Sequence, residues 1–387
     1  MMSKKSPQLR FEGFTDDWEE RKLGDFLKTP EKVKAHIQSK DDLMTLKLNL
    51  GGLESGSNRE TLELGSTIYY KRKAGQFIYG KQNFFNGSMA IIPIDLDGKA
   101  TSGDVPSLDV VGILSEYLYV YVSRGDYWKS KEAEASGTGS KRIHEKILQG
   151  FDIKVPSTQN EQTKIGSLFK QLDNTITIHQ RKLDLLKEQK KGYLQKMFPK
   201  NGAKVPELRF AGFADDWEER KLSDIVDRFD NLRVPITASD RKPGDTPYYG
   251  ANGIQDYVEG FTHNGEFILV AEDGANDLKN YPVQYVNGKV WVNNHAHVLQ
   301  GKKTITDNKF LMNAIKNFNI EPFLVGGGRA KLNADVMMKL NILLPTFVEQ
   351  EKIGSLFSLL DKTIALHQRK LDLLKEQKKG FLQKMFV

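Results

Sequence analysis

Apolar positions in two segments of the chain recur at alternating spacings of four and three residues. The first segment runs from Ile165 to Met197 and the second from Ile353 to Met385. This spacing is that of a heptad seam, so it predicts two long helices. At 1.5 Å per residue, each helix would extend about 50 Å. A narrow apolar stripe is exposed to water on an isolated helix, so each helix needs a partner.

The simplest partner for each helix is the other helix. An antiparallel coiled coil is expected if the globular segments lie at its opposite ends, and an ordinary pair of core helices is the alternative. The predicted seam consists of Ile165, Phe169, Leu172, Ile176, His179, Leu183 and Leu186 in the first helix, and of Ile353, Phe357, Leu360, Ile364, His367, Leu371 and Leu374 in the second. His179 and His367 are interpreted as a polar pair that sets the register, because two histidines alone make a poor metal site.

The two helices are part of a longer internal repeat. Residues 165–198 and 353–386 differ at only six of 34 positions, and LRFEGFTDDWEERKL from Leu9 recurs as LRFAGFADDWEERKL from Leu208. The segments between these strings, about 27–150 and 226–340, show little likeness. Two like surfaces can bind two copies of one partner by pseudo-twofold symmetry, whereas two unlike inserts can recognise two different things.

The repeat predicts four parts of the chain. Residues 1–150 form a first globular domain with its arm, 151–200 a first helix and linker, 201–340 a second domain with the repeated arm, and 341–387 a second helix. Short alternating runs broken by Gly, Asn and Asp predict strands in both inserts. These runs are STIYY, QFIYG and SMAIIPI in the first insert, and EFILVAEDG, PVQYV and KVWVNNHAHVL in the second.

Each insert ends in a cluster of glycines beside basic residues. The clusters run from Gly137 to Arg142 and from Gly326 to Lys331. Glycine backbone N–H groups next to Arg and Lys are suited to hold a phosphate, although a plain turn is equally compatible with the pattern.

Composition narrows the classes of protein to which the chain can belong. Its 387 residues are enough for two domains with their own cores. The absence of cysteine excludes disulfides and thiolate metal sites and favours a reducing compartment. No apolar run is long enough to cross a bilayer, and the first residues lack the apolar core of a signal peptide. We therefore expect a cytoplasmic protein without membrane contact.

The excess of positive charge lies on the helices. The net charge of +7 and the pI of about 9.1 point weakly to an anionic partner. Residues 161–200 carry nine Lys and Arg against four Asp and Glu, while residues 27–150 carry seventeen against fifteen. Bulk charge therefore does not identify the inserts as nucleic-acid binding.

The sequence contains no recognisable catalytic motif. It lacks a Walker A string, a paired zinc-ligand spacing, a serine nucleophile elbow and a dinucleotide glycine fingerprint. His295 and His297 are two residues apart on a predicted strand and would share a face, but a third metal ligand is not evident. No catalytic residue and no metal site are predicted, and a hydrolase with an unrecognised site is the least favoured interpretation.

The order of these features resembles the specificity subunit of type I restriction-modification systems over nearly the whole chain. The string FxGFxDDWEERKL, a variable domain, (V/L)PxxxxEQxKIGxLFxxLD and a long helix occur twice in that order. Pro156 precedes EQTKI and Pro345 precedes EQEKI, with one extra residue in the first link. The stretch from Tyr248 to Gly274 also resembles one recurring class of target recognition domain.

The resemblance implies a mixed α/β protein with two target recognition domains and an antiparallel coiled coil. Each domain would read one half of a bipartite, asymmetric site in double-stranded DNA, while the coiled coil sets the gap and docks two methyltransferase subunits. The chain itself would be non-catalytic and bind no cofactor. The resemblance further implies that methyltransferase subunits use S-adenosylmethionine to methylate adenine N6, and that restriction and translocase subunits use ATP and Mg. The rival interpretation is a coiled-coil scaffold that does not bind DNA.

Candidate DNA contacts are the polar and basic residues of the predicted strands and turns. In the first insert they are Tyr69, Tyr70, Lys71, Arg72, Lys81, Gln82 and Asn83, and in the second Tyr249, Asn252, Asn276, Asn294 and His295. The basic residues beside the glycine clusters, which would contact phosphates, are Lys141, Arg142, Arg329 and Lys331.

Overall fold

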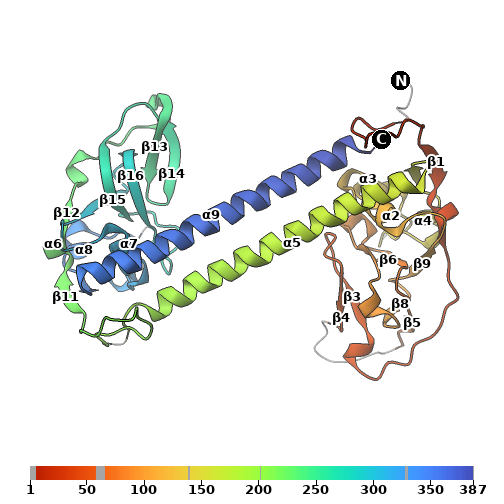
Figure 1. The fold of residues 1–387 in the computed structure, drawn as a ribbon, viewed down its shortest axis with the longest axis horizontal. Helices are drawn as coiled ribbons and strands as arrows, with labels where there is room; N and C mark the ends of the chain where they lie inside the picture. The colour runs from red at the N-terminus through yellow and green to blue at the C-terminus, as the bar shows by residue number, and fades with distance from the viewer. Residues whose placement is uncertain (1–5, 58–65, 138–139, 201, 327–329, 387) are drawn as a thin grey trace. The chain divides into compact units, whose positions relative to one another are not determined.

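The chain divides into two compact units (Figure 1). The computed structural model describes residues 6–57, 66–137, 140–200, 202–326 and 330–386. Unit 1 comprises residues 1–179 and 370–387, and unit 2 comprises residues 180–369. Each unit therefore contains one insert, the arm that precedes it and part of both long helices.

The two predicted long helices are confirmed. They are α5 (Gln159–Lys196) and α9 (Phe347–Lys384), each with 38 residues. Most of the predicted seam residues are buried, and the half-buried ones are Ile176, His179, Ile364 and His367. His179 and His367 belong to different units, and their pairing stays a prediction.

Within each unit, the segments of the two long helices run antiparallel. In unit 1 the Phe169 and Phe386 rings lie 5.9 Å apart, and Lys378 Nζ lies 2.5 Å from an Asp173 carboxylate oxygen. Increasing residue numbers along α5 thus lie beside decreasing residue numbers along α9. Unit 2 repeats the arrangement, with Phe198 against Phe357 at 6.0 Å and Lys190 bonded to Asp361 at 2.5 Å.

Both inserts contain the same four-stranded antiparallel core, which the sequences did not reveal. In unit 1 its spatial order is β2 (Leu27–Lys28), β9 (Ser107–Val110), β6 (Phe77–Tyr79) and β7 (Met89–Ile91). In unit 2 it is β12 (Val226–Arg228), β17 (Ala296–Gly301), β15 (His263–Ala271) and β16 (Val283–Val292), extended by β13 (Pro243–Gly250) and β14 (Gly253–Val258). Corresponding strands follow the same order along the chain.

The elements around this core also correspond between the units. The equivalent pairs are β1 (Glu19–Lys22) and β11 (Glu218–Lys221), α1 (Leu23–Phe26) and α6 (Leu222–Ile225), α2 (Ser115–Val122) and α7 (Asn308–Asn317), α4 (Glu145–Gln149) and α8 (Ala334–Met337), and β10 (Asp152–Val155) and β18 (Asn341–Leu344). Unit 1 alone adds β3 (Met44–Leu46), β4 (Leu53–Ser55), β5 (Tyr69–Lys71), β8 (Ala100–Ser102) and α3 (Gly125–Ser130).

One predicted strand is divided in the structure. The run KVWVNNHAHVL contributes its first residues to β16, which ends at Val292, and its last residues to β17, which begins at Ala296. Between them the side-chain oxygen of Asn293 accepts a hydrogen bond from the His295 N–H at 2.8 Å, closing a turn. His295 therefore precedes the strand on which His297 lies.

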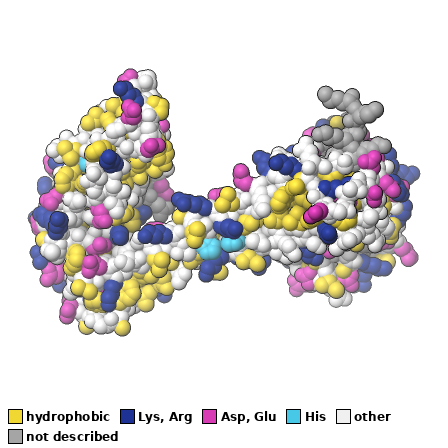
Figure 2. Space-filling view, turned by 45° about the horizontal axis from the view of Figure 1, so that its top comes forward, with side chains coloured by type: hydrophobic (Ala, Val, Ile, Leu, Met, Phe, Trp, Pro, Cys, Tyr) yellow, Lys and Arg dark blue, Asp and Glu magenta, His cyan; other side chains and the backbone are white. Residues whose placement is uncertain are grey.

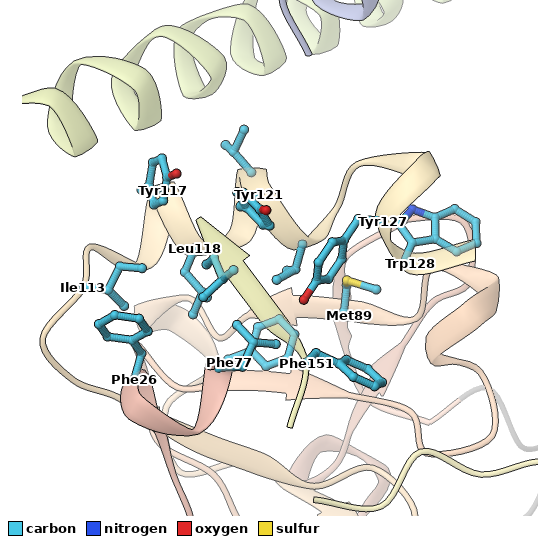
Figure 3. Close-up of a cluster of buried hydrophobic side chains, with 14 of the residues drawn as sticks. Phe26, Phe77, Met89, Ile113, Tyr117, Leu118, Tyr121, Tyr127, Trp128 and Phe151 are labelled. Atoms are coloured by element: carbon cyan, nitrogen blue, oxygen red, sulfur yellow. The ribbon is translucent and has the colours of Figure 1, made fainter. Parts of the chain in front are cut away.

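Aromatic side chains just beyond the ends of the long helices complete the core of each unit. Figure 3 shows the cluster in unit 1, where Phe77 of β6, Tyr117 and Tyr121 of α2 and Phe151 gather. The Phe386 ring, beyond the end of α9, packs 5.7 Å from Tyr121. In unit 2 Phe198, beyond the end of α5, stacks on Phe310 at 5.6 Å. Each insert therefore depends on a segment distant in the sequence.

The repeated arms tie the start of one long helix to the end of the other. Arg10 forms a two-point ion pair with Glu161 of α5 at 2.7 and 2.8 Å, and the Leu9 N–H donates to the Lys384 carbonyl at 2.8 Å. Arg209 binds Glu349 with the same two distances. Glu161 is only 1% exposed, so its carboxylate needs the arginine.

A glycine in each long helix lets the helix of the insert approach closely. A Cβ atom on Gly354 of α9 would overlap the Asp307 carboxylate and lie 2.9 Å from the Phe310 amide nitrogen of α7. A Cβ atom on Gly166 of α5 would lie 2.9 Å from the Glu116 Cβ of α2. Glycine costs helix stability, so close packing accounts for its presence here.

We predict that Gly354→Ala lowers the free energy of unfolding by about 1–3 kcal/mol, because the added methyl group overpacks the contact with α7. Gly380→Ala is the matched control, since nothing lies within 4 Å of its Cβ position on the same helix. The control should gain about 0.5–1 kcal/mol from helix propensity. Urea denaturation followed by circular dichroism measures both, and an equal gain in the two variants would contradict the packing argument.

Candidate nucleic-acid interface

Three chain segments of unit 1 meet where β6 ends. The Lys81 N–H donates to the Asp104 carbonyl at 2.9 Å, and the Ile143 N–H donates to the Lys81 carbonyl at 2.8 Å. We call residues 81–83, 104 and 142 the first corner. It brings together Lys81, Gln82 and Arg142, which the sequence placed in two separate candidate clusters.

The same backbone arrangement recurs where β15 ends in unit 2. The Glu272 N–H donates to the His295 carbonyl at 2.8 Å, and the Leu332 N–H donates to the Glu272 carbonyl at 2.7 Å. We call residues 272–274, 295 and 331 the second corner. Positions 81, 82, 104 and 142 thus correspond to positions 272, 273, 295 and 331.

The residues that flank each glycine cluster are paired by backbone hydrogen bonds beside the corner. Ser136 and Arg142 exchange two backbone hydrogen bonds at 3.0 and 2.9 Å, and Val325 and Lys331 exchange two at 2.9 Å. Gly137, the first residue of the first cluster, has a φ of 113°, a backbone conformation that disfavours other residues. Residues 138–139 and 327–329 lie outside the described residues, so the choice between a plain turn and a phosphate site stays a prediction.

Ion pairs hold the side chains of the first corner in place. Lys81 lies 3.2 Å from Glu145, and Arg142 lies 2.8 Å from Asp104. With its amide oriented to accept, Gln82 receives hydrogen bonds from Ser140 at 2.9 Å and from Arg142 at 2.8 Å. Burial alone would raise the pKa of Glu145, but a backbone N–H and Lys81 outweigh it and hold that pKa below its usual value.

The second corner uses different residues for equivalent contacts. Lys331 lies 2.9 Å from Glu272, which also binds Arg233 at 2.7 Å, and the His295 Nδ1 lies 2.5 Å from Asp273. Burial would raise the pKa of Glu272, but Arg233 and Lys331 hold it below its usual value. Glu272 and Asp273 therefore occupy the positions in the second corner that Lys81 and Gln82 occupy in the first, on a similar backbone.

A buried histidine paired with a carboxylate supports the second corner. His297 is 1% exposed, and its Nδ1 lies 2.7 Å from Asp230 while its Nε2 lies 2.9 Å from the Leu332 carbonyl. The Asp230 carboxylate and the Leu332 carbonyl therefore engage the two nitrogens of the ring from opposite sides. With both nitrogens engaged, His297 is not placed to bind a metal, and the described residues contain no metal-binding group of three His, Cys, Asp or Glu.

Two candidate residues of the first insert are occupied inside the protein. Tyr69 is buried, and Arg72 is 5% exposed. The Arg72 guanidinium donates to Thr101 at 2.8 Å and to the carbonyls of Ser102 and Val105. Burial lowers the pKa of Arg72 to about 10. We therefore leave Tyr69 and Arg72 out of the proposed interface.

The other candidates lie at or near the surface. Asn252 joins the second corner, because its amide donates to the Gly274 carbonyl at 2.9 Å and accepts from the Asn276 N–H at 3.0 Å. The remaining exposed or half-buried candidates are Tyr70, Lys71, Asn83, Lys141, Tyr249 and Asn294. Arg329 lies outside the described residues.

Sequence reasoning missed the acidic members of both corners. Asp104, Glu272 and Asp273 were not candidates, because carboxylates repel phosphates and Asp104 is 38 residues from Arg142 in the chain. Bulk charge gives no further guide. In Figure 2, Lys and Arg are interspersed with Asp and Glu over the visible face of both units.

No described helix is long and apolar enough to cross a membrane.

Comparisons with known proteins give a consistent family. The family model described as the type I restriction modification DNA specificity domain matches residues 15–188 and 214–376. A putative type I restriction enzyme specificity subunit from Haemophilus influenzae is 43% identical over 154 residues, which cover 40% of this chain and 39% of that protein. The MjaVIII specificity subunit from Methanocaldococcus jannaschii is 24% identical over 220 residues, 55% of this chain and 50% of that protein.

The chain therefore matches half or less of the length of these two relatives. One solved structure has a similar fold throughout. It is the S subunit of a type I restriction-modification system from M. genitalium, with a TM-score of 0.70, 15% sequence identity and coverage of 99% of both chains.

We predict that Asp230→Asn lowers the free energy of unfolding by about 1.5–3 kcal/mol at pH 7, because His297 and the Val298 N–H lose a charged hydrogen-bond acceptor. Burial would raise the pKa of Asp230, but His297 and a backbone N–H hold it below its usual value. Its stabilising contribution is therefore present above the unfolded pKa of about 3.9 and lost as the pH falls below it. Urea titrations from pH 7 to pH 3 should show that the free energy of unfolding falls less on acidification in the variant than in the wild type. An equal fall in both proteins would contradict the assignment.

Proposed function

This chain belongs to the type I restriction-modification DNA specificity family, and on that premise we propose that it is a non-catalytic subunit that binds double-stranded DNA. Each unit reads one half of a bipartite, asymmetric site, and α5 and α9 set the gap between the halves. The observation that carries the proposal is that the two units repeat one backbone and present chemically different corners.

A DNA duplex presents the same backbone chemistry at both half-sites but different base edges. Contacts to phosphates position a protein, whereas contacts to base edges specify the sequence. A repeated frame with unlike polar side chains suits this division of roles. The salt dependence of binding separates this function from that of a scaffold, because neutralising phosphates makes affinity fall steeply with salt.

Exposed leucine and isoleucine side chains on the long helices supply a surface for partners. On α9, Leu359, Leu366 and Leu373 are 63%, 66% and 66% exposed at intervals of seven residues. On α5, Ile178 and Leu185 occupy the positions equivalent to Leu366 and Leu373 and are 65% and 67% exposed. Residues seven apart share a helix face, so each helix carries an apolar stripe.

In the proposed assembly, two copies of one methyltransferase subunit dock on these two stripes. S-adenosylmethionine then belongs to the methyltransferase, and ATP and Mg belong to restriction and translocase subunits. This chain holds none of these cofactors. Because the assembly acts on cellular DNA, we also propose a cytoplasmic location.

The first test concerns modularity. Replacing residues 27–150 by the equivalent insert of a related chain with another specificity should change one half-site and leave the other intact. The measurement is sequencing of the adenines methylated when the chimaera is expressed with its methyltransferase. Replacing residues 226–340 is the reciprocal control and should change the other half. If either exchange changed both half-sites, the modular assignment would be contradicted.

The second test concerns the stripes. The double variant Ile178→Lys, Leu366→Lys places two charges on the proposed docking surface and should reduce co-purification of the methyltransferase at least tenfold. Each methyltransferase copy loses one such side chain, whose burial contributes about 1.5–3 kcal/mol, so the affinity of each copy falls about tenfold or more. Ile94→Lys is the control, because Ile94 is 87% exposed and lies away from the helices in sequence. Equal recovery of methyltransferase with both variants would place the docking surface elsewhere.

A further inference from the structure

We propose that the two corners are the positions that set which bases each unit reads, and that their side chains are exchangeable between the units. The inference rests on the proposed function and deepens it. It assigns specificity to four equivalent pairs of positions: 81 and 272, 82 and 273, 104 and 295, and 142 and 331.

The backbone of the two corners is the same by three independent criteria. The hydrogen bond from Lys81 to Asp104 matches the one from Glu272 to His295. The bond from Ile143 to Lys81 matches the one from Leu332 to Glu272. The strand that leads into each corner has the same register against its neighbour, with Phe77 opposite Leu108 and Ile268 opposite Leu299.

The inward-facing neighbours of the corners keep one chemical character. Ile143 and Leu332, like Leu108 and Leu299, are fully buried apolar residues at equivalent positions. Burial in a close-packed core explains that restriction. The corner positions carry Lys, Gln, Asp and Arg in unit 1 but Glu, Asp, His and Lys in unit 2. The fold therefore requires apolar residues at the inward-facing positions, but it does not determine which polar residues occupy the corners.

The chemistry of the two corners suits different bases. Arg142 and Gln82 offer the donors and acceptors that recognise guanine and adenine in the major groove. Glu272 and Asp273 offer acceptors, which suit the amino groups of cytosine or adenine and are repelled by phosphates. The carboxylates of Glu272 and Asp273 are therefore better explained by base reading than by attachment to the DNA backbone.

The ion pairs within the corners prepare these side chains for recognition. Asp104 holds one end of the Arg142 guanidinium at 2.8 Å, and Gln82 lies 2.8 Å from another of its nitrogens. Fixing a long side chain before binding reduces the entropy lost on binding. Arg142 is about one-third exposed, so it is held in place and still accessible.

The experiment converts the first corner into the second. The variant Lys81→Glu, Gln82→Asp, Asp104→His, Arg142→Lys is made in the full chain and assembled with its methyltransferase. The probe is a library of DNA duplexes with randomised sequence, and the bound duplexes are sequenced. We expect base preference to shift about tenfold or more at one or two positions of the first half-site, with the second half-site unchanged. The control exchanges the charges of an exposed pair elsewhere in unit 1, Glu116→Lys with Lys170→Glu, and should shift neither half.

A second variant covers the case in which four substitutions unfold unit 1. Arg142→Lys keeps the positive charge but removes the planar fork that binds guanine at two points. It should relax preference for guanine at one position of the first half-site about tenfold, with the thermal unfolding midpoint and the affinity for unrelated DNA unchanged.

The outcomes separate the inference from the proposed function. If folded variants select the same two half-sites as the wild type, the corners do not set specificity, although the chain still reads DNA. If the wild-type assembly itself selects no sequence from the library, the proposed function fails, and the inference fails with it.

Discussion

Burial of the heptad seam is the constraint on which the rest of the structure depends. Neither insert completes a core by itself, because unit 1 needs Phe386 against Phe169 and unit 2 needs Phe198 against Phe357. Fully burying a phenylalanine stabilises a fold by about 1.5–3 kcal/mol, so each unit gains substantially from a segment distant in the chain. Each long helix contributes one part to each unit. The two cores are thus linked through α5 and α9, and the seam couples their folding.

Ionic contacts select one alignment of that seam. Lys190 with Asp361 and Lys378 with Asp173 occupy equivalent places in the two units, and a slip of the helices by one heptad would separate both pairs. The Arg10 and Glu161 pair adds a stricter condition, because a buried carboxylate without its partner is strongly destabilising. Apolar packing therefore provides most of the stability, while these charges specify the register.

The long helices were predictable because a heptad pattern is local, and the seam residues follow directly from it. The shared sheet was not predictable, since β6 has only three residues and its register depends on Leu108, far along the chain. Clusters of polar and basic residues indicated parts of both corners. Their assembly was not visible, because Gln82 meets Arg142 only through tertiary structure. The same limit applies to Arg72, whose burial depends on β8 and the loop after it rather than on its neighbours in the sequence.

The physical cost of substitution explains why one part of the repeat is preserved within this chain while another has diverged. A change in the seam leaves a cavity or an unpaired buried charge, and each costs several kcal/mol. The pair of Arg142 and Asp104 in the first corner is different, because both side chains are substantially exposed. Exposed pairs contribute about 0–1 kcal/mol, so their residues can change without loss of the fold. A scaffold organised in this way separates stability from recognition: the seam tolerates little variation, whereas the corners can acquire new chemistry on an unchanged backbone.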